Sequence, residues 1–191
     1  MKASTSTSSS PREGRRNTPH SASPSVSRST SGSPSVRHPP SNEHPLSVLI
    51  TGSSRGSIGG ALAAAFARQN LTVFATAREP SKIDPAIASL PNVHPLKLDV
   101  TNPQSVSQAV EQVLVKTKGK LNFLINNAGS GYTIPLAEVE IDIGKKIFDV
   151  NLWGVLNVTK AFVPFLVETG GTVVNISSVG ALVNTPWIGK I

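Results

Sequence analysis

The sequence predicts an α/β fold with a doubly wound parallel sheet of about five strands, preceded by a disordered tail. From Leu46 onward, short apolar runs alternate with segments of helical periodicity, a pattern typical of βαβ units. Residues 1–45 instead consist mainly of Ser, Thr, Pro and Arg, with almost no large apolar side chain. Such a segment cannot offset the entropy cost of ordering. We therefore expect a disordered tail over 1–45 and an incomplete Rossmann-type domain over 46–191.

Five apolar runs predict the strands, at 46–51, 72–77, 93–99, 121–126 and 172–177. Each run is apolar at consecutive positions, which indicates a strand buried on both faces between two layers of helices. The connecting segments predict helices over 58–69, 105–117 and 142–167. The segment 80–90 gives only a weak helical pattern, because Pro85 interrupts it.

Composition narrows the classes of function. The formal charge is +7, but the tail contributes +4 of it through six basic and two acidic residues, so the folded part is only mildly basic. We expect no nucleic-acid partner. The absence of cysteine excludes disulfides and thiol chemistry and fits an intracellular protein; no metal site is predicted. No uninterrupted apolar run predicts a transmembrane segment. A transit peptide in the tail stays open as an alternative, although repeated prolines would break its helix.

A glycine-rich segment directly follows the first predicted strand. It reads Thr51-Gly-Ser-Ser-Arg-Gly-Ser-Ile-Gly59 and leads into an alanine-rich helix. Glycines let a backbone turn sharply and approach a pyrophosphate, while the amides and positive dipole of a helix start attract its charge. The setting of strand, loop and helix therefore favours a dinucleotide site. A tight turn without a ligand is the alternative.

Four further motifs occur in a fixed order after the glycine loop. They are Leu98-Asp-Val-Thr101, Asn126-Asn-Ala-Gly129, Asn151 in the long helix, and Asn175-Ile-Ser-Ser178. Together with the loop they resemble the short-chain dehydrogenase/reductase family over 46–187. Gly56 and Gly59 are separated by one residue more than in most of that family. The longer spacing resembles a fungal branch that includes NADPH-dependent 1-acyldihydroxyacetone-phosphate reductases.

The end of the second strand predicts NADP as the cofactor. An acid there would bind the ribose 2′-hydroxyl of NAD, whereas this chain has Arg78, and Arg55 in the glycine loop could add a second guanidinium. Arg78 could instead be a surface residue paired with Glu79. The resemblance further implies that Asp99 contacts the adenine and Asn126 the adenosine ribose, while Asn127 braces neighbouring strands. The predicted cofactor-binding set is Gly52, Ser54, Arg55, Gly56, Ile58, Gly59, Arg78, Asp99, Val100, Asn126 and Lys160.

The resemblance also implies how a carbonyl would be reduced. In the family a tyrosine donates the proton, and a nearby lysine lowers the pKa of its phenol. Ser178 matches the serine that holds the substrate oxygen, and Asn151 matches the asparagine that supports a proton relay. Ser178 could instead satisfy amides of its own loop. The tyrosine would fall at about position 191, which is Ile, and the one tyrosine present is Tyr132.

We therefore expect a C-terminally truncated NADPH-dependent carbonyl reductase, inactive as this chain. The resemblance suggests a small-molecule carbonyl substrate, such as 1-acyldihydroxyacetone phosphate or a similar lipid ketone. It also implies a homo-oligomer for a full-length member, and a cytoplasmic location or one at the endoplasmic reticulum or lipid droplet surface. The alternative is a non-catalytic NADP-binding fragment or interaction module that lacks the tyrosine and lysine.

Overall fold

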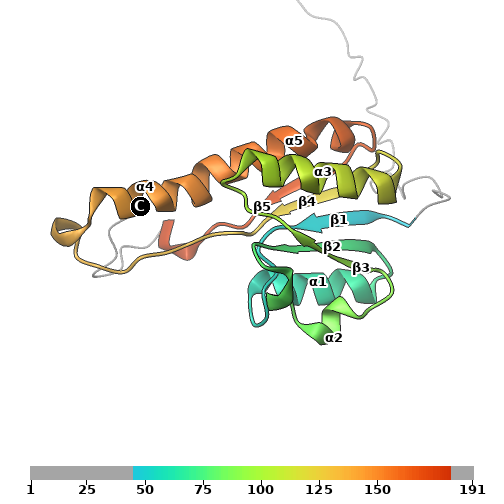
Figure 1. The fold of residues 1–191 in the computed structure, drawn as a ribbon, viewed down its shortest axis with the longest axis horizontal. Helices are drawn as coiled ribbons and strands as arrows, with labels where there is room; N and C mark the ends of the chain where they lie inside the picture. Colours follow the sequence, from blue (N-terminus) through green and yellow to red (C-terminus); the bar gives the residue numbers. More distant parts are fainter. Residues whose placement is uncertain (1–44, 182–191) are drawn as a thin grey trace, which may run out of the picture. The chain divides into compact units, whose positions relative to one another are not determined.

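The computed structural model describes residues 45–181 and confirms a parallel α/β sheet with helices on both sides (Figure 1). All strand pairs are parallel, in the order β3-β2-β1-β4-β5. The strands are β1 (Ser47–Ile50), β2 (Thr72–Ala77), β3 (Val93–Lys97), β4 (Phe123–Asn126) and β5 (Thr172–Asn175). The predicted disordered tail lies outside the described residues, apart from Pro45.

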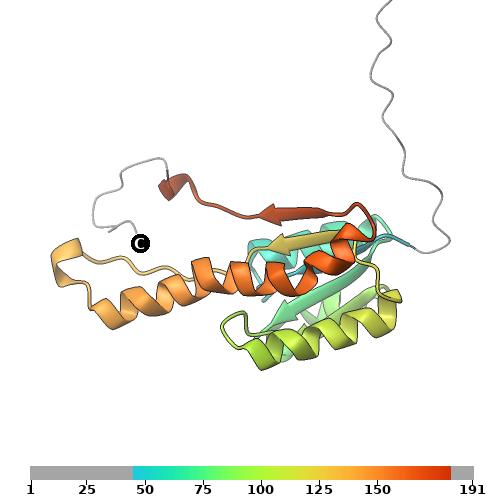
Figure 2. The ribbon, with the colours of Figure 1, turned by 90° about the horizontal axis from the view of Figure 1, so that it is seen from above.

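Two helical layers cover the sheet. Helices α1 (Ile58–Arg68) and α2 (Pro85–Ala88) lie on one face, and α3 (Pro103–Thr117) and α5 (Val155–Val167) lie on the other (Figures 1 and 2). Along β1, Leu49 packs into the core beneath α3 and α5, whereas Val48 and Ile50 pack into the core beneath α1. This alternation explains why the central strands are apolar at every position.

The helices begin at capping residues that the sequence already contains. Asn102 accepts hydrogen bonds from the Gln104 and Ser105 amides, so α3 begins at Pro103, two residues before its predicted start. The segment 80–90 is interrupted directly before Pro85, and it forms two short helices, η1 (Pro80–Lys82) and α2. Asp84 caps α2 through the Ala86 amide, and Pro85 is the first residue of that helix, where a missing N–H costs nothing.

Two strands depart from the prediction of burial on both faces. β3 and β5 form the edges of the sheet, and β3 has Pro95 exposed. Every residue of β5 is exposed, with Val173 at 37% and Val174 at 38%. Within residues 45–181 no strand pairs with the outer side of β5. The apolar character of this edge therefore leaves a surface able to accept another strand.

The long helix predicted at 142–167 is present but not regular. Helix α4 (Ile141–Phe148) passes through a π-helical turn, η3 (Asp149–Gly154), into α5, and α4 projects beyond the sheet (Figure 2). A Cβ on Gly154 would lie 2.6 Å from Cγ2 of Val100, so the turn packs closely against the loop after β3. The irregular turn therefore lies where the helix meets that loop.

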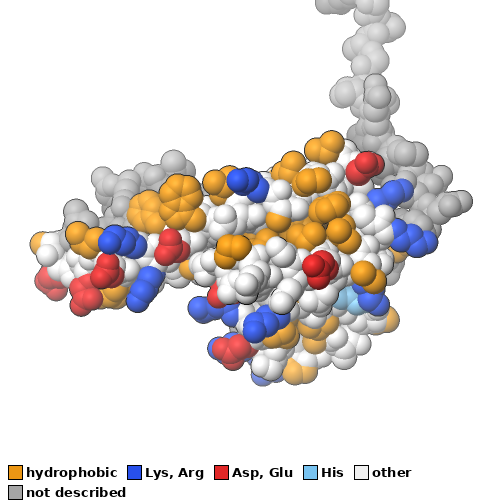
Figure 3. Space-filling view, turned by 45° about the horizontal axis from the view of Figure 1, so that its top comes forward, with side chains coloured by type: hydrophobic (Ala, Val, Ile, Leu, Met, Phe, Trp, Pro, Cys, Tyr) orange, Lys and Arg blue, Asp and Glu red, His pale blue; other side chains and the backbone are white. Residues whose placement is uncertain are grey.

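The same helical stretch bears on the membrane prediction. Ile141–Val167 is 27 residues long and contains an 18-residue window with a mean hydropathy of 1.4, so by length and composition alone it could cross a membrane. Its inner face packs on the sheet through Val158 and Phe162, both fully buried, but only 22% of that window is buried. Hydrophobic side chains gather on its outer face (Figure 3), including Ile141, Phe148, Leu152, Trp153, Leu156, Val163 and Val167.

Candidate cofactor site

A cleft of about 450 Å³ lies where the strands end at their carboxyl edge. The chain runs from β1 outward to β2 and β3, then returns to place β4 on the other side of β1. Ligands of open α/β sheets bind at such a switch point. The cleft is lined by Gly52, Ser54, Ser57, Ile58, Ala77, Arg78, Leu98, Asp99, Val100, Thr101, Asn127, Ala128, Gly129, Ser130 and Val150.

The glycine loop needs its glycines for close approach to the loop after β4. Gly52 has φ +71°, and a Cβ there would lie 2.9 Å from Cα of Ala128. A Cβ on Gly59 would lie 2.5 Å from Nδ2 of Asn127. Any side chain at either position would force the two loops apart. Gly56, at φ +73°, needs glycine for its backbone conformation alone.

The start of α1 supplies the positive end of a helix dipole to this cleft. Ser57 is the N-cap, and its Oγ accepts a hydrogen bond from the Gly60 amide at 3.1 Å. The same hydroxyl lies 2.7 Å from the Ser54 carbonyl oxygen, to which it donates. The first turn carries apolar and glycine residues rather than acids. An anion in the cleft would therefore meet amides and a positive dipole.

Thr51 and Asn127 hold the two loops of the cleft together. The Thr51 hydroxyl oxygen accepts hydrogen bonds from the backbone amides of Asn127 and Ala128, each at 2.9 Å. In return, Nδ2 of Asn127 donates to the carbonyl oxygens of Thr51 and Gly52, each at 2.9 Å. The predicted bracing role of Asn127 is confirmed. The floor of the cleft is thus fixed by four hydrogen bonds between the ends of β1 and β4.

Arg78 is the cation that lines the cleft, directly after β2. It forms no ion pair within residues 45–181, and the alternative pairing with Glu79 is not seen. Glu79 instead accepts a 2.8 Å contact from Nζ of Lys82. That hydrogen bond, with the charge of Lys82, lowers the pKa of Glu79 below its usual value. Arg78 therefore remains free to meet an anion.

Arg55 does not line the cleft in this structure. Its Nε lies 3.5 Å from Oδ2 of Asp84, and its side chain is 65% exposed. The prediction that Arg55 faces the cofactor phosphate is thus not met by the geometry seen here. The spacing of the glycine loop could place Arg55 near the cleft but could not reveal that Asp84, from another crossover, competes for it.

The loop after β3 forms the opposite wall. Asp99 and Val100 both line the cleft, as the resemblance implied. Oδ1 of Asp99 accepts hydrogen bonds from the Thr101 amide at 3.0 Å and from the Thr101 hydroxyl at 2.7 Å. These bonds turn the carboxylate onto its own loop. Its other oxygen remains available to a donor on the ligand.

Asn126 and Lys160 do not reach the cleft. Asn126 is only 3% exposed, and its Nδ2 donates to Oγ1 of Thr159 at 3.0 Å and to Oδ1 of Asn175 at 2.8 Å. Oδ1 of Asn126 has no partner within the described part of the chain. Its side chain ties β4 to α5 and β5 rather than facing a ribose, contrary to the expectation. Lys160 is exposed on α5.

The two predicted catalytic residues are engaged by backbone groups. Asn151 lies in the π-helical turn, where Oδ1 accepts from the Ser130 amide and Nδ2 donates to the Ser130 carbonyl, both at 2.8 Å. Ser130 lines the cleft, so Asn151 supports its wall. Ser178 is exposed after β5, and its Oγ accepts from the Gly180 amide at 3.1 Å. This contact matches the alternative predicted for Ser178.

Several site residues were missed by sequence reasoning. Thr51, Ser57 and Asp84 each hold the glycine loop, and Thr101 and Ser130 complete the walls of the cleft. Ser57 carried a signal, since serine before an apolar helical run is a typical N-cap.

Position 191 lies outside the described residues, and Tyr132 is partly exposed in the loop after β4. Among residues 45–181, no three His, Asp or Glu side chains gather as metal ligands.

Comparison with known proteins agrees with this geometry. The family model described as short chain dehydrogenase matches residues 47–189. The chain is 44% identical to short-chain dehydrogenase ptmH of Penicillium ochrochloron over 142 residues, covering 74% of this chain and 52% of the relative. It is 41% identical to the NADPH-dependent 1-acyldihydroxyacetone phosphate reductase of Schizosaccharomyces pombe, covering 69% and 44%. The chain thus spans about half the length of these curated relatives.

Solved structures give the same assignment. The alcohol dehydrogenase of Thermococcus sibiricus, complexed with 5-hydroxy-NADP, superposes with a TM-score of 0.68 at 30% identity, covering 75% of this chain and 63% of that one. A gluconate 5-dehydrogenase of Burkholderia cenocepacia, in complex with NADP and tartrate, gives 0.68 at 29% identity, covering 76% and 58%. The family match over residues 47–189 and the superpositions agree with the resemblance seen in the sequence motifs. The chain belongs to the short-chain dehydrogenase family.

Proposed function

We propose that this chain binds NADPH and forms the cofactor-binding half of a carbonyl reductase. One observation carries the choice of cofactor: Arg78, without an ion-pair partner in the described residues, lines the cleft directly after β2. A guanidinium at this place attracts a ribose 2′-phosphate, whereas an acid would bind the 2′-hydroxyl of NAD. The relative from Schizosaccharomyces pombe is named as NADPH-dependent, which supports the same choice.

Each wall of the cleft offers groups that suit one part of a dinucleotide. Gly52 lets the glycine loop lie directly against Ala128, because a Cβ there would come within 2.9 Å of Cα of Ala128, and the start of α1 borders the cleft with its amides. These groups would hold the pyrophosphate, Arg78 the 2′-phosphate, and Asp99 with Val100 the adenine. When bound, the nicotinamide supplies hydride. The residues of this chain would bind and orient the cofactor.

Binding of the nucleotides to the full chain tests this proposal. We expect NADPH and 2′,5′-ADP to bind more tightly than NADH and ADP in calorimetric titrations. Replacing Arg78 with Gln should weaken NADPH about tenfold, because a charge-assisted hydrogen bond contributes roughly 1.5 kcal/mol or more, and should leave NADH unchanged. Arg68→Gln is the matched control, since Arg68 is an exposed arginine in the last turn of α1, outside the cleft. Equal affinities for NADPH and NADH would contradict the choice of cofactor.

Carbonyl reduction is the second part of the proposal. Members of the family act on small molecules, and we propose a lipid ketone such as 1-acyldihydroxyacetone phosphate, after the relative with that name. Ser178 would donate its hydroxyl hydrogen to the substrate oxygen, because its contact with the Gly180 amide uses Oγ only as an acceptor, and Asn151 would support the relay. Oxidation of NADPH, followed by its absorbance with the ketone present, tests turnover.

A second candidate function is cofactor binding without catalysis. The residue at position 191 favours it, because the proton-donating tyrosine of the family would fall there and this chain has Ile. Tight NADPH binding without ketone-dependent oxidation would support this second reading. Measurable turnover that Ser178→Ala abolishes would exclude it.

Self-association is a further proposal about the whole protein. The outer face of the stretch formed by α4, η3 and α5 carries exposed apolar residues, among them Phe148, Trp153 and Leu156. Surfaces of this kind on soluble proteins commonly form contacts with other chains. Sedimentation of the full chain at several concentrations tests the proposal, and a monomer throughout would contradict it.

A further inference from the structure

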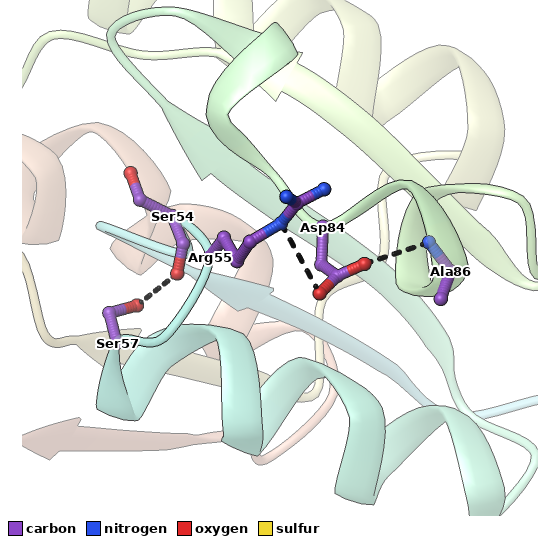
Figure 4. Close-up of polar contacts among 5 residues, drawn as sticks. All are labelled: Ser54, Arg55, Ser57, Asp84 and Ala86. Carbon is purple, nitrogen blue, oxygen red and sulfur yellow. Dashed lines mark hydrogen bonds and ion pairs between the residues drawn. The ribbon is translucent and has the colours of Figure 1, made fainter.

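The glycine loop is attached from the side by the segment that follows β2. The Arg55 amide donates to the Lys82 carbonyl oxygen at 2.7 Å. The Arg55 side chain extends in the same direction, and its Nε meets Oδ2 of Asp84 at 3.5 Å (Figure 4). Asp84 thus lies beside the one cation that the glycine loop itself carries.

The carboxylate of Asp84 is held in this orientation by a second contact. Its Oδ1 accepts a hydrogen bond from the Ala86 amide at 2.9 Å, so one oxygen caps α2 while the other faces Arg55 (Figure 4). The Asp84 side chain is 34% exposed, about half as exposed as that of Arg55. The carboxylate is therefore the more fixed member of the pair. Arg55 is the member able to move.

We propose that Asp84 is a specificity-determining residue that restrains Arg55 from the 2′-phosphate of NADPH. This inference rests on the proposed NADPH site. The guanidinium of Arg55 pairs with Asp84 instead of lining the cleft, whereas Arg78 lines it. A 2′-phosphate that recruits Arg55 must compete with the Asp84 carboxylate for it. Asp84 also carries a negative charge, which would repel the 2′-phosphate of NADPH.

Both effects of Asp84 act in one direction. Neutralising it frees Arg55 and removes a like charge, so binding of a 2′-phosphate should strengthen in either case. NADH has no 2′-phosphate and should be indifferent to the change. Because the pair is solvent-exposed, its strength is that of a surface ion pair, and we expect a gain of about two- to fivefold in affinity.

The test compares nucleotide affinities of full-chain variants. Asp84→Asn removes the charge but keeps an oxygen able to cap α2, so the fold should persist. Asp142→Asn is the matched control, because it neutralises another exposed aspartate, paired with Lys145 at 3.2 Å on α4. We expect Asp84→Asn to bind NADPH and 2′,5′-ADP about two- to fivefold more tightly, with NADH and ADP unchanged. The control should match the wild type.

A double variant identifies Arg55 as the mediator. Most of the gain should disappear when Asp84→Asn is combined with Arg55→Gln, compared with Arg55→Gln alone. Unchanged or weaker NADPH binding in Asp84→Asn overturns the proposal, as does an equal gain for NADH. A wild-type chain without preference for NADPH would instead refute the proposed cofactor. The two failures are therefore distinguishable.

Discussion

The hydroxyl of Thr51 is predicted to stabilise the cofactor cleft through two backbone amides. Thr51 is 1% exposed, and its Oγ1 is the acceptor for the amides of Asn127 and Ala128. Thr51→Val exchanges the hydroxyl for a methyl group of similar size and leaves both amides without that acceptor. An unpaired buried amide costs about 1–3 kcal/mol. Because Asn127 and Ala128 are half-buried, we expect a loss near the lower end for each, about 2–3 kcal/mol together.

Thr51→Ser provides the matched control. Serine keeps the acceptor oxygen and loses only one methyl group, so its cost should be about 1 kcal/mol. The free energy of unfolding, measured by circular dichroism in urea, compares the two variants. NADPH affinity should also fall more in Thr51→Val, since both amides belong to residues that line the cleft. If the two variants lose the same stability, the hydroxyl is not the acceptor that orders these loops, and our account of the cleft floor is wrong.

Two further predictions concern the glycine loop and the edge of the sheet. Gly59→Ala should abolish measurable NADPH binding, because the added Cβ would lie 2.5 Å from Nδ2 of Asn127. Gly131→Ala is the control and should bind like the wild type, because Gly131 has open space around it. Normal binding by Gly59→Ala would contradict the predicted contact. His94 packs on the Phe74 ring, and burial, followed by the charge of Lys116, lowers its pKa below the usual 6.5. The folded state therefore favours neutral His94, so its contribution to stability is complete above pH 6.5 and is lost as the pH falls below that value. The free energy of unfolding should thus fall less on acidification in His94→Gln than in the wild type, and identical pH profiles would exclude this role.

Much of the fold could be predicted because the central strands and the helices that cover them carry their own signals. β2 (Thr72–Ala77) was predicted to the residue, since its apolar run begins after Asn70-Leu71 and ends at Arg78. The edge strands were not distinguished from the central ones, because Val173 and Val174 look like core residues in sequence. Whether a strand is buried depends on which neighbouring strands and helices cover it. The sequence of the strand itself does not contain that information.

The candidate site, like the fold, could be predicted from the sequence only in part. Gly52, Arg78 and Asp99 reach the cleft because each lies within two residues of the end of a strand, and parallel strands end at one edge. Asn126 also ends a strand, but its side chain points beneath the cleft, toward Thr159. Arg55 does not line the cleft, because it pairs with Asp84, a residue from a different crossover. Strand ends could thus be predicted from sequence, whereas side-chain direction and long-range pairing could not.

The π-helical turn at Asp149–Gly154 lets the helix carry one extra residue while α5 stays seated on the sheet. A π turn holds one residue more than a regular α-helical turn. Deleting one residue inside the turn would therefore let it become α-helical with little rotation of α5, so Val158, Phe162 and Leu166 would keep their places in the core. Asn151 lies inside the turn, so the same deletion would displace its two hydrogen bonds to Ser130. The wall of the cleft can thus be altered at this turn without unseating the helix that covers the sheet.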